Sequence, residues 1–151
     1  MALAREMKRR NVDVLLIQEH NVKKESVLTA ASQLDRAEIF SAWSCSASKE
    51  ERGGTAVWIR QCAAISPHVA VDHKRGENLD GGLCIVEATI GSDPVRIASV
   101  YVTVHASKRN EYIKNLSTHP LINSDTIIGG DMNCVADTSL DFKTLDESER
   151  E

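Results

Sequence analysis

The chain has 151 residues, of which 42% are hydrophobic and 26% are charged. This length corresponds to one domain of about 150 residues, and the hydrophobic fraction is typical of a globular rather than a disordered protein. The net charge of -4 excludes a protein that holds nucleic acid by bulk positive charge. An aromatic content of 4% argues against a surface on which several bases stack. Any phosphate-binding site is therefore expected to be local.

The sequence has the features of an intracellular protein. The first ten residues are charged every few positions and lack the apolar stretch of a secretory signal, and no apolar run approaches the roughly 18 residues that cross a membrane. The cysteines lack the close spacing that binds zinc or exchanges disulfides, so we expect reduced, mostly buried thiols. They are Cys45, Cys62, Cys84 and Cys134. We expect the nucleus or the cytoplasm, without secretion and without a membrane partner.

The first predicted elements are a helix over residues 2–10 and a strand over 12–17. The strand is a short apolar run rich in β-branched residues, which predicts a central place in a sheet. It stops at a polar group that begins with Gln18 and Glu19. Glu19 is therefore placed at the carboxyl end of the strand, where open sheets bind their ligands. A second helix is predicted over 25–36.

Several strands and one helix follow. Strands are predicted where apolar runs are separated by glycine, proline, aspartate and serine, at 39–43, 54–59, 68–71, 83–90 and 95–104. The turn over 91–94 predicts a hairpin with a four-residue loop. Ser107 is expected to cap a helix that runs to Leu116 and has Tyr112 on its apolar face. A last strand, 126–128, leads into the segment 129–133.

This order of elements predicts an α/β (α+β) protein. It suits either a mixed sheet with helices packed on one face or half of a two-sheet sandwich flanked by helices. We expect the folded domain to span residues 1–140. Residues 141–151 are polar and acidic, and they are expected to form a loosely ordered tail.

The ends of two buried strands have the residues most suited to chemistry. Glu19 follows the first strand, and Asp131 and Asn133 follow the last strand after two glycines. Mg²⁺ is commonly held by one or two carboxylates together with water and substrate phosphate, which suits Glu19. Asp131 has the chemistry to deprotonate a water that Asn133 orients. Taken alone, however, Glu19 is also typical of a solvated strand end, and the other two are typical of a turn that bonds its own backbone.

The five histidines do not have the spacing of a zinc site. We single out His105 because it closes the predicted strand 95–104, whose neighbours are expected to include the site. The simpler interpretation of His105 is a histidine of a surface loop.

Five segments, in this order and at these separations, resemble the endonuclease/exonuclease/phosphatase superfamily. Its members include apurinic-type endonucleases, retrotransposon endonucleases and phosphoinositide phosphatases. Residues 12–19 resemble its strand that ends in Gln-Glu, and residues 53–57 resemble the glycine-led strand that follows. Residues 97–102 resemble a strand that ends in tyrosine, and 108–112 resemble the start of the next helix. Residues 126–133 resemble a Gly-Asp-Phe-Asn segment, with Met in place of Phe.

The resemblance covers roughly residues 2–135 and implies a partial four-layer α/β sandwich with a mixed sheet and flanking helices. It implies that Glu19 binds Mg²⁺, with Mn²⁺ as the alternative ion, and that Tyr101 contacts the scissile phosphate. It further implies that Asp131 activates water and that Asn133 positions it. Two segments, residues 18–21 and 108–112, resemble the retroelement-type endonucleases, which implies DNA as the substrate.

Some family features do not occur in these 151 residues. The family has an opening strand with an asparagine near the metal and a closing Asp-His pair, and neither is found here. We therefore expect impaired phosphodiester hydrolysis and self-association through the exposed inner face of a sheet. Two alternatives stay open: a phosphatase of the same superfamily, and a non-catalytic remnant or interaction module with the same fold.

Overall fold

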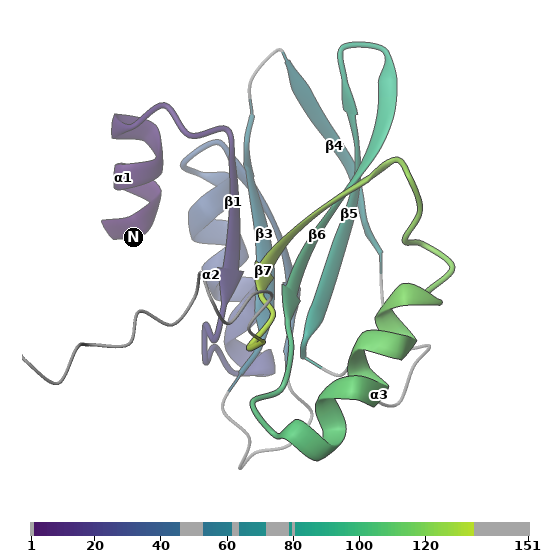
Figure 1. The fold of residues 1–151 in the computed structure, drawn as a ribbon. Coiled ribbons are helices and arrows are strands. Elements are labelled where there is room, and N and C mark those ends of the chain that lie inside the picture. Colours follow the sequence, from purple (N-terminus) through teal and green to yellow (C-terminus); the bar gives the residue numbers. More distant parts are fainter. Residues whose placement is uncertain (1, 46–52, 62–63, 72–78, 80, 135–151) are drawn as a thin grey trace, which may run out of the picture.

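The computed structural model describes residues 2–45, 53–61, 64–71, 79 and 81–134. In these residues the helices and strands form four layers. Figure 1 shows α1 (Ala2–Arg9) and α2 (Val27–Asp35) on one side of two stacked sheets, and α3 (Ala106–Ser117) on the other side. A short 3-10 helix, Lys24–Ser26, precedes α2. The predicted α/β sandwich with flanking helices is confirmed.

The first sheet contains β1 (Val14–Gln18), β3 (Thr55–Arg60) and β2 (Ile39–Ser44), in that order, and both strand pairs are antiparallel. One face of this sheet packs against α1 and α2. The buried residues of this contact are Ala4, Met7, Leu34, Ile39, Ala56 and Trp58. Ala4 and Met7 lie three positions apart on α1, the spacing that places both side chains on one helix face.

The second sheet contains β4 (Ile65–Val71), β5 (Leu83–Ile90), β6 (Asp93–Tyr101) and β7 (Thr126–Asp131), in that order. The first three strands are antiparallel, whereas β7 is parallel to β6 because α3 forms the crossover between them. The outer face packs against α3 through Leu83, Ile85, Ala98, Val100, Tyr112 and Leu116. The core between the sheets includes Val57, Ile59, Cys84, Val86 and Ile97.

The prediction of a central position for the first strand is wrong. Among the described strands β1 lies at an edge, beside β3 only. It is apolar on both sides because both of its faces are covered. Leu16 packs into the core between the sheets, while Leu15 and Ile17 pack toward the helices. An apolar run of this kind indicates that both faces of the strand are covered. It does not show how many strands lie beside it.

The hairpin between β5 and β6 is tighter than the sequence predicts. Ile90 pairs with Asp93, so the loop consists of Gly91 and Ser92 rather than four residues. Pro94 therefore lies inside β6. It is tolerated there because β7 first pairs with β6 at Arg96, and the missing N–H of Pro94 faces no strand on that side.

The ends of the last elements also differ from the prediction. β6 ends at Tyr101 rather than at residue 104, and β7 continues to Asp131 rather than ending at 128. The backbone N–H of Val102 donates to the carbonyl of Asp131, so the two strands remain joined just past Tyr101. His105, not Ser107, is the N-cap residue of α3. The buried positions of Tyr112 and Leu116 on α3 are confirmed.

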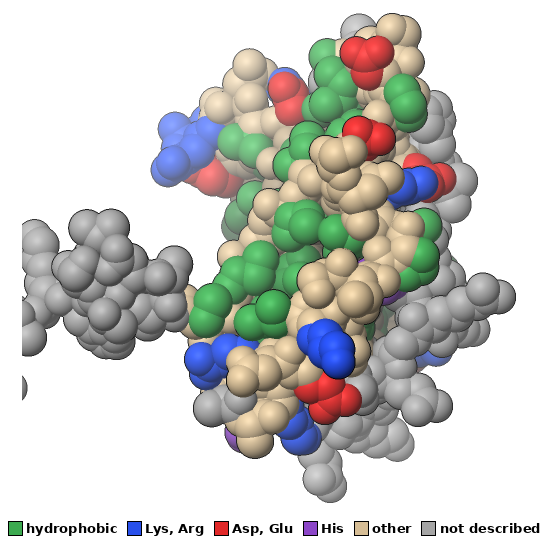
Figure 2. Space-filling model, turned by 45° about the vertical axis from the view of Figure 1, so that its right-hand side comes forward, with side chains coloured by type: hydrophobic (Ala, Val, Ile, Leu, Met, Phe, Trp, Pro, Cys, Tyr) green, Lys and Arg blue, Asp and Glu red, His purple; other side chains and the backbone are tan. Residues whose placement is uncertain are grey.

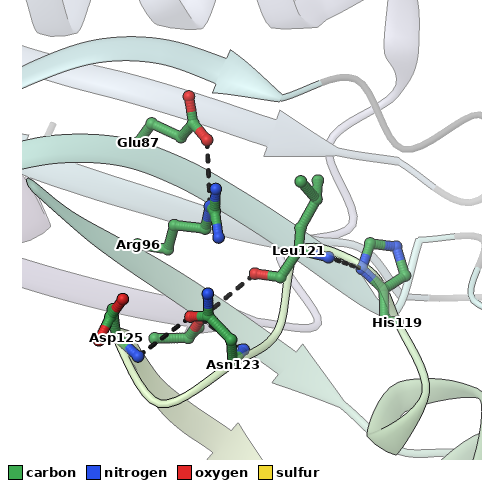
Figure 3. A network of polar contacts seen from close by, with 7 residues as sticks. Glu87, Arg96, His119, Leu121, Asn123 and Asp125 are labelled. Atoms are coloured by element: carbon green, nitrogen blue, oxygen red, sulfur yellow. Dashed lines mark hydrogen bonds and ion pairs between the residues drawn. The ribbon is translucent and has the colours of Figure 1, made fainter.

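The connection from α3 to β7 is held by local hydrogen bonds (Figure 3). The backbone N–H of Leu121 donates to Nδ1 of His119 at 3.3 Å, and that of Asp125 donates to Oδ1 of Asn123 at 3.0 Å. Nearby, Arg96 and Glu87 form a cross-strand ion pair at 3.0 Å. Because the backbone N–H of Arg96 also bonds the carbonyl of Asp125, this connection enters β7 in a fixed register beside β6.

Cys84 and Cys134 are free thiols, and the described cysteines differ in burial. Cys84 is buried, Cys45 is half-buried and Cys134 is exposed, so the expectation of mostly buried thiols does not hold for Cys134. Burial raises the pKa of the Cys84 thiol to about 12. Cys62 and the predicted tail 141–151 lie outside the described residues.

Candidate active site

The candidate site lies at one end of the sandwich, where β1, β6 and β7 finish (lower end of Figure 1). Tyr101 and Asp131 are register partners at the last pair of the parallel β6–β7 ladder. Glu19 follows directly after β1, and Asn133 comes two residues after β7. Residues from three strand ends are thus brought to one edge by the packing of the two sheets.

Glu19 and Tyr101 are in direct contact across the two sheets. The Tyr101 hydroxyl donates a hydrogen bond to Oε1 of Glu19, 82 residues away in sequence. Glu19 is exposed and has a backbone φ of +51°, so the chain turns sharply as it leaves β1. The side-chain amide of Asn21 donates to the Glu19 carbonyl at 2.8 Å, and the backbone N–H of Asn21 donates to the carbonyl of Gly53 at 3.1 Å. These bonds hold the turn against the loop that leads into β3.

Asp131 and Asn133 form a compact turn at the end of β7. The backbone N–H of Asn133 donates to Oδ1 of Asp131 at 2.9 Å, and its side-chain amide donates to the carbonyl of Val102 at 2.7 Å. This is the backbone-bonding turn that the sequence also allowed. It fixes the Asp131 carboxylate beside Tyr101.

The surroundings of Tyr101 raise the pKa of its phenol. The largest cause is the hydrogen bond to Glu19, followed by desolvation and by the charge of Glu19; the Asp131 carboxylate adds to the rise, and a hydrogen bond from Asn133 opposes it. The hydroxyl therefore stays protonated at neutral pH and acts as a donor. The hydrogen bond from Tyr101 to Glu19 and the pairing of Tyr101 with Asp131 bring these three residues together, and Asn133 follows two positions after Asp131.

The donor set fits a hard divalent cation. Two carboxylates and an amide would offer oxygen ligands, and Mg²⁺ commonly takes one or two carboxylates and completes its shell with water and phosphate. The exposed side chain of Glu19 is open to such a shell. In the described part of the chain no group of three or more His, Cys, Asp or Glu gathers into a ready-made metal cage. The arrangement thus suits an ion that takes some of its ligands from the protein and the others from water and a substrate.

In the described part of the chain, His105 forms no hydrogen bond or ion pair with these residues. It is exposed at the start of α3, and its backbone N–H donates to the Thr103 hydroxyl at 3.3 Å. His20, next to Glu19, has a structural role. Its Nδ1 accepts the Val22 N–H at 2.9 Å, and its Nε2 lies 3.2 Å from the carbonyl oxygen of Ser44, so Nε2 bears the proton.

One contribution to the site was missed by the sequence prediction. The buried Ser99 hydroxyl bonds both Gln18 and the carbonyl of Ile17. Its only signal in the sequence is a hydroxyl inside the apolar run over residues 97–102, two residues before Tyr101. Such a residue is compatible with many roles until the partner strand is known.

The chain belongs to the Endonuclease/Exonuclease/phosphatase family, whose sequence model matches residues 2–148. The superfamily contains nucleases and phosphatases, and its members are generally dependent on divalent metal ions. The predicted resemblance is confirmed. A comparison with curated protein sequences gives no match.

Several solved structures of this superfamily are similar in fold. ANGEL2, a 2′,3′-cyclic phosphatase, aligns with a TM-score of 0.63 and 15% identity over 91% of this chain and 44% of its own. D. rerio TDP2, solved with a single-strand DNA product, aligns with a TM-score of 0.58 and 13% identity over 91% and 54%. The endonuclease domain of TRAS1, a telomere-specific non-LTR retrotransposon, gives a TM-score of 0.54 and 17% identity over 89% and 52%. The chain spans about half the length of these structures.

No helix in the described residues is both long enough and apolar enough to cross a bilayer.

Proposed function

We propose that this chain hydrolyses phosphodiester bonds in DNA with a divalent cation, Mg²⁺ or alternatively Mn²⁺, as an endonuclease of the retroelement type. The observation that supports this proposal is the meeting of Glu19, Tyr101, Asp131 and Asn133 at the ends of three strands. The choice of DNA is supported by two structural neighbours, the TRAS1 endonuclease domain and TDP2 with its DNA product.

Each of the four residues has a role that its chemistry supports. Glu19 would hold the cation, which when bound supplies positive charge next to the phosphate and its leaving oxygen. Asp131 would accept the proton of the attacking water, and Asn133 would help to orient that water. The Tyr101 hydroxyl, held protonated by its neighbours, would donate a hydrogen bond to a phosphate oxygen.

The first experiment is nicking of supercoiled plasmid by the 151-residue chain with Mg²⁺, with and without EDTA. We expect nicking that EDTA abolishes and that Asp131→Asn lowers by roughly 100-fold to 1000-fold, the usual cost of removing a positioned base. Asp125→Asn is the matched control, because Asp125 lies at the opposite end of β7 and should leave nicking unchanged. Nicking that survives both EDTA and Asp131→Asn would overturn the proposal.

A second substrate separates the proposed endonuclease from a phosphatase with the same fold. ANGEL2 is a 2′,3′-cyclic phosphatase, so a nucleoside 2′,3′-cyclic phosphate and a phosphomonoester are incubated with the chain in parallel. Turnover of either one, without nicking, would replace DNA as the substrate. Turnover of none of the three substrates would overturn hydrolysis and favour a non-catalytic interaction module.

We also propose that the chain associates with a second copy of itself. The sequence predicts contact through an exposed inner sheet face, but the inner faces of the two sheets pack against each other, so we place the contact at the edge strand β7. The strand β7 is an edge of its sheet in the described residues, and its Ile127 and Ile128 are 52% and 39% exposed. Figure 2 shows hydrophobic side chains gathered across the middle of one face of the molecule. Sedimentation velocity at increasing concentration should show a dimer, and a single monomer species at every concentration would contradict the proposal.

An intracellular location, in the nucleus or the cytoplasm, is a further part of the proposal. It is supported by Cys84 and Cys134, which are free thiols and are maintained as such in reducing compartments. Fractionation of cells that express the chain tests it, and recovery from the medium would contradict it.

A further inference from the structure

The two sheets approach closely at the end where the site lies, because two small residues face β1 there. Ser99 on β6 and Gly129 on β7 are register partners in the parallel ladder. A Cβ on Gly129 would lie 2.5 Å from Cδ1 of Leu16, so the missing side chain makes room for β1. The hydroxyl of the neighbouring Ser99 forms hydrogen bonds with the last two residues of β1.

The hydroxyl of Ser99 makes two hydrogen bonds to β1. It donates to the carbonyl of Ile17 at 3.0 Å and accepts from Nε2 of Gln18 at 3.0 Å. The serine is fully buried, with 0% of its surface exposed. Both bonds are thus shielded from water, and losing either would leave a buried polar group unpaired, which is costly.

The location of these bonds relates them to the site. Ile17 and Gln18 directly precede Glu19, and Ser99 lies two residues before Tyr101 on the same strand. Residues two apart on a strand face the same side, so Ser99 and Tyr101 both point from β6 toward β1. The serine therefore sets the distance between the two backbones from which the Glu19 and Tyr101 side chains extend.

We propose that Ser99 and Gln18 are positioning residues that hold Glu19 in its place beside Tyr101 and thereby set the affinity of the site for a divalent cation. This inference rests on the metal-binding role proposed for Glu19. Partners that orient a metal ligand typically account for about 10-fold to 100-fold in metal affinity. Neither residue touches the substrate in this proposal.

The test compares two variants that each remove one buried hydroxyl. Ser99→Ala removes the two bonds to β1. Thr55→Val is the matched control, because Thr55 is fully buried and pairs with Gln18 in the sheet, while its hydroxyl has no hydrogen-bond partner among the described residues. Mn²⁺ affinity is measured by electron paramagnetic resonance, and the free energy of unfolding is measured by urea denaturation.

We expect Ser99→Ala to weaken Mn²⁺ binding by about 10-fold to 100-fold, Gln18→Met to weaken it in the same direction, and Thr55→Val to leave it within about twofold of the wild type. Wild-type affinity in Ser99→Ala, or an equal loss in Thr55→Val, would overturn the proposal. A purely structural role would lower the stability of Ser99→Ala without this difference in affinity.

A metal-free readout separates this inference from the proposed function. The chain has two tyrosines, Tyr101 and Tyr112, so ring-labelled tyrosine gives few signals in a nuclear Overhauser experiment. The wild type should show contact between the Tyr101 ring and the Glu19 side chain, and Ser99→Ala should lose it. Retention of this contact in Ser99→Ala overturns the positioning role. Mn²⁺ affinity that is unchanged in Glu19→Gln overturns instead the metal-binding role of Glu19.

Discussion

Gly130 occupies a backbone conformation that other residues rarely adopt. Its φ is +154°, and an added Cβ would lie 1.8 Å from the carbonyl oxygen of Val100 on the neighbouring strand. Because that oxygen belongs to the backbone, it cannot move aside as a flexible side chain would. The glycine next to Asp131 therefore allows β7 to lie against β6 up to the residue that faces Tyr101.

We predict that Gly130→Ala lowers the free energy of unfolding by about 3 kcal/mol, the upper range for a strained backbone conformation. Gly91→Ala is the control, because Gly91 has a φ of +64° and open space around its Cβ position. It should cost only about 1 kcal/mol, the conformational part alone. Urea denaturation measures both, and equal losses would contradict the steric argument.

His119 predicts a dependence of stability on pH. It is buried, and desolvation lowers its pKa from the ordinary 6.5. Below pH 6.5 the unfolded chain therefore binds a proton that the folded chain does not yet bind. The contribution of His119 to the free energy of unfolding therefore falls as the pH drops through 6.5, and it levels off below the folded-state pKa.

The measurement is urea denaturation at pH 7.5 and at pH 5.5. The wild type should lose more stability between these two values than His119→Gln, which cannot take up the proton. His20, whose pKa burial also lowers, is present in both proteins, so its contribution cancels in the comparison. An equal loss in the two proteins would show that His119 titrates alike in the folded and unfolded chains.

At the scale of elements, α3 is bound to its sheet by apolar contact rather than by hydrogen bonds of its buried side chains. Leu116 and Tyr112 both enter the outer core. The Tyr112 hydroxyl is buried without a hydrogen-bond partner in the described part of the chain, and this burial raises its pKa. The tyrosine thus contributes its ring, while its hydroxyl opposes the packing.

We therefore predict that Tyr112→Phe changes the free energy of unfolding by less than about 1 kcal/mol, or raises it, because an unpaired buried polar group is removed. Leu116→Ala, one turn further along the same helix face, should cost about 2–4 kcal/mol through the cavity that it leaves. Thermal or urea unfolding compares the two. A large loss in Tyr112→Phe would show that the hydroxyl has a partner.

The elements themselves could largely be predicted from the sequence, because hydrophobic periodicity and turn residues act locally. The exceptions are positions at which a neighbouring element, rather than the local sequence, determines the conformation of the chain. Pro94 suggests the end of a turn, yet it is accepted inside β6 because β7 starts beyond it. Ser107 has good capping chemistry, yet the chain already turns into α3 at His105.

At the scale of the whole molecule, the candidate site could be named from the sequence only through the order of its segments. Glu19 and Tyr101 are 82 residues apart, and nothing local to either residue predicts that they touch. Their contact depends on two sheets that stack with Ser99 and Gly129 at the contact. Stacking is a long-range outcome of packing, so Ser99 could not be recognised from its own neighbourhood in the sequence.

The two edges of the second sheet differ in their protection against pairing with another strand. β4 has Pro67 and a shift of register between Pro67 and Val69, and both features hinder strand addition. β7 has no proline, and its residues from 126 to 130 are uncharged. An exposed, uncharged edge of this kind favours pairing with a second chain, which is the physical basis of the proposed self-association.

We predict that Ile127→Lys on β7 converts the dimer into a monomer, because a lysine on an edge strand opposes the pairing of two copies. Leu28→Lys is the matched control: Leu28 is 82% exposed on α2, so the same kind of exchange is made away from this edge. Both changes affect exposed side chains, and each should alter the free energy of unfolding of the monomer by no more than about 0.5 kcal/mol. Sedimentation velocity distinguishes the two variants. A dimer that persists in Ile127→Lys, or that is lost equally in Leu28→Lys, would show that the copies meet elsewhere.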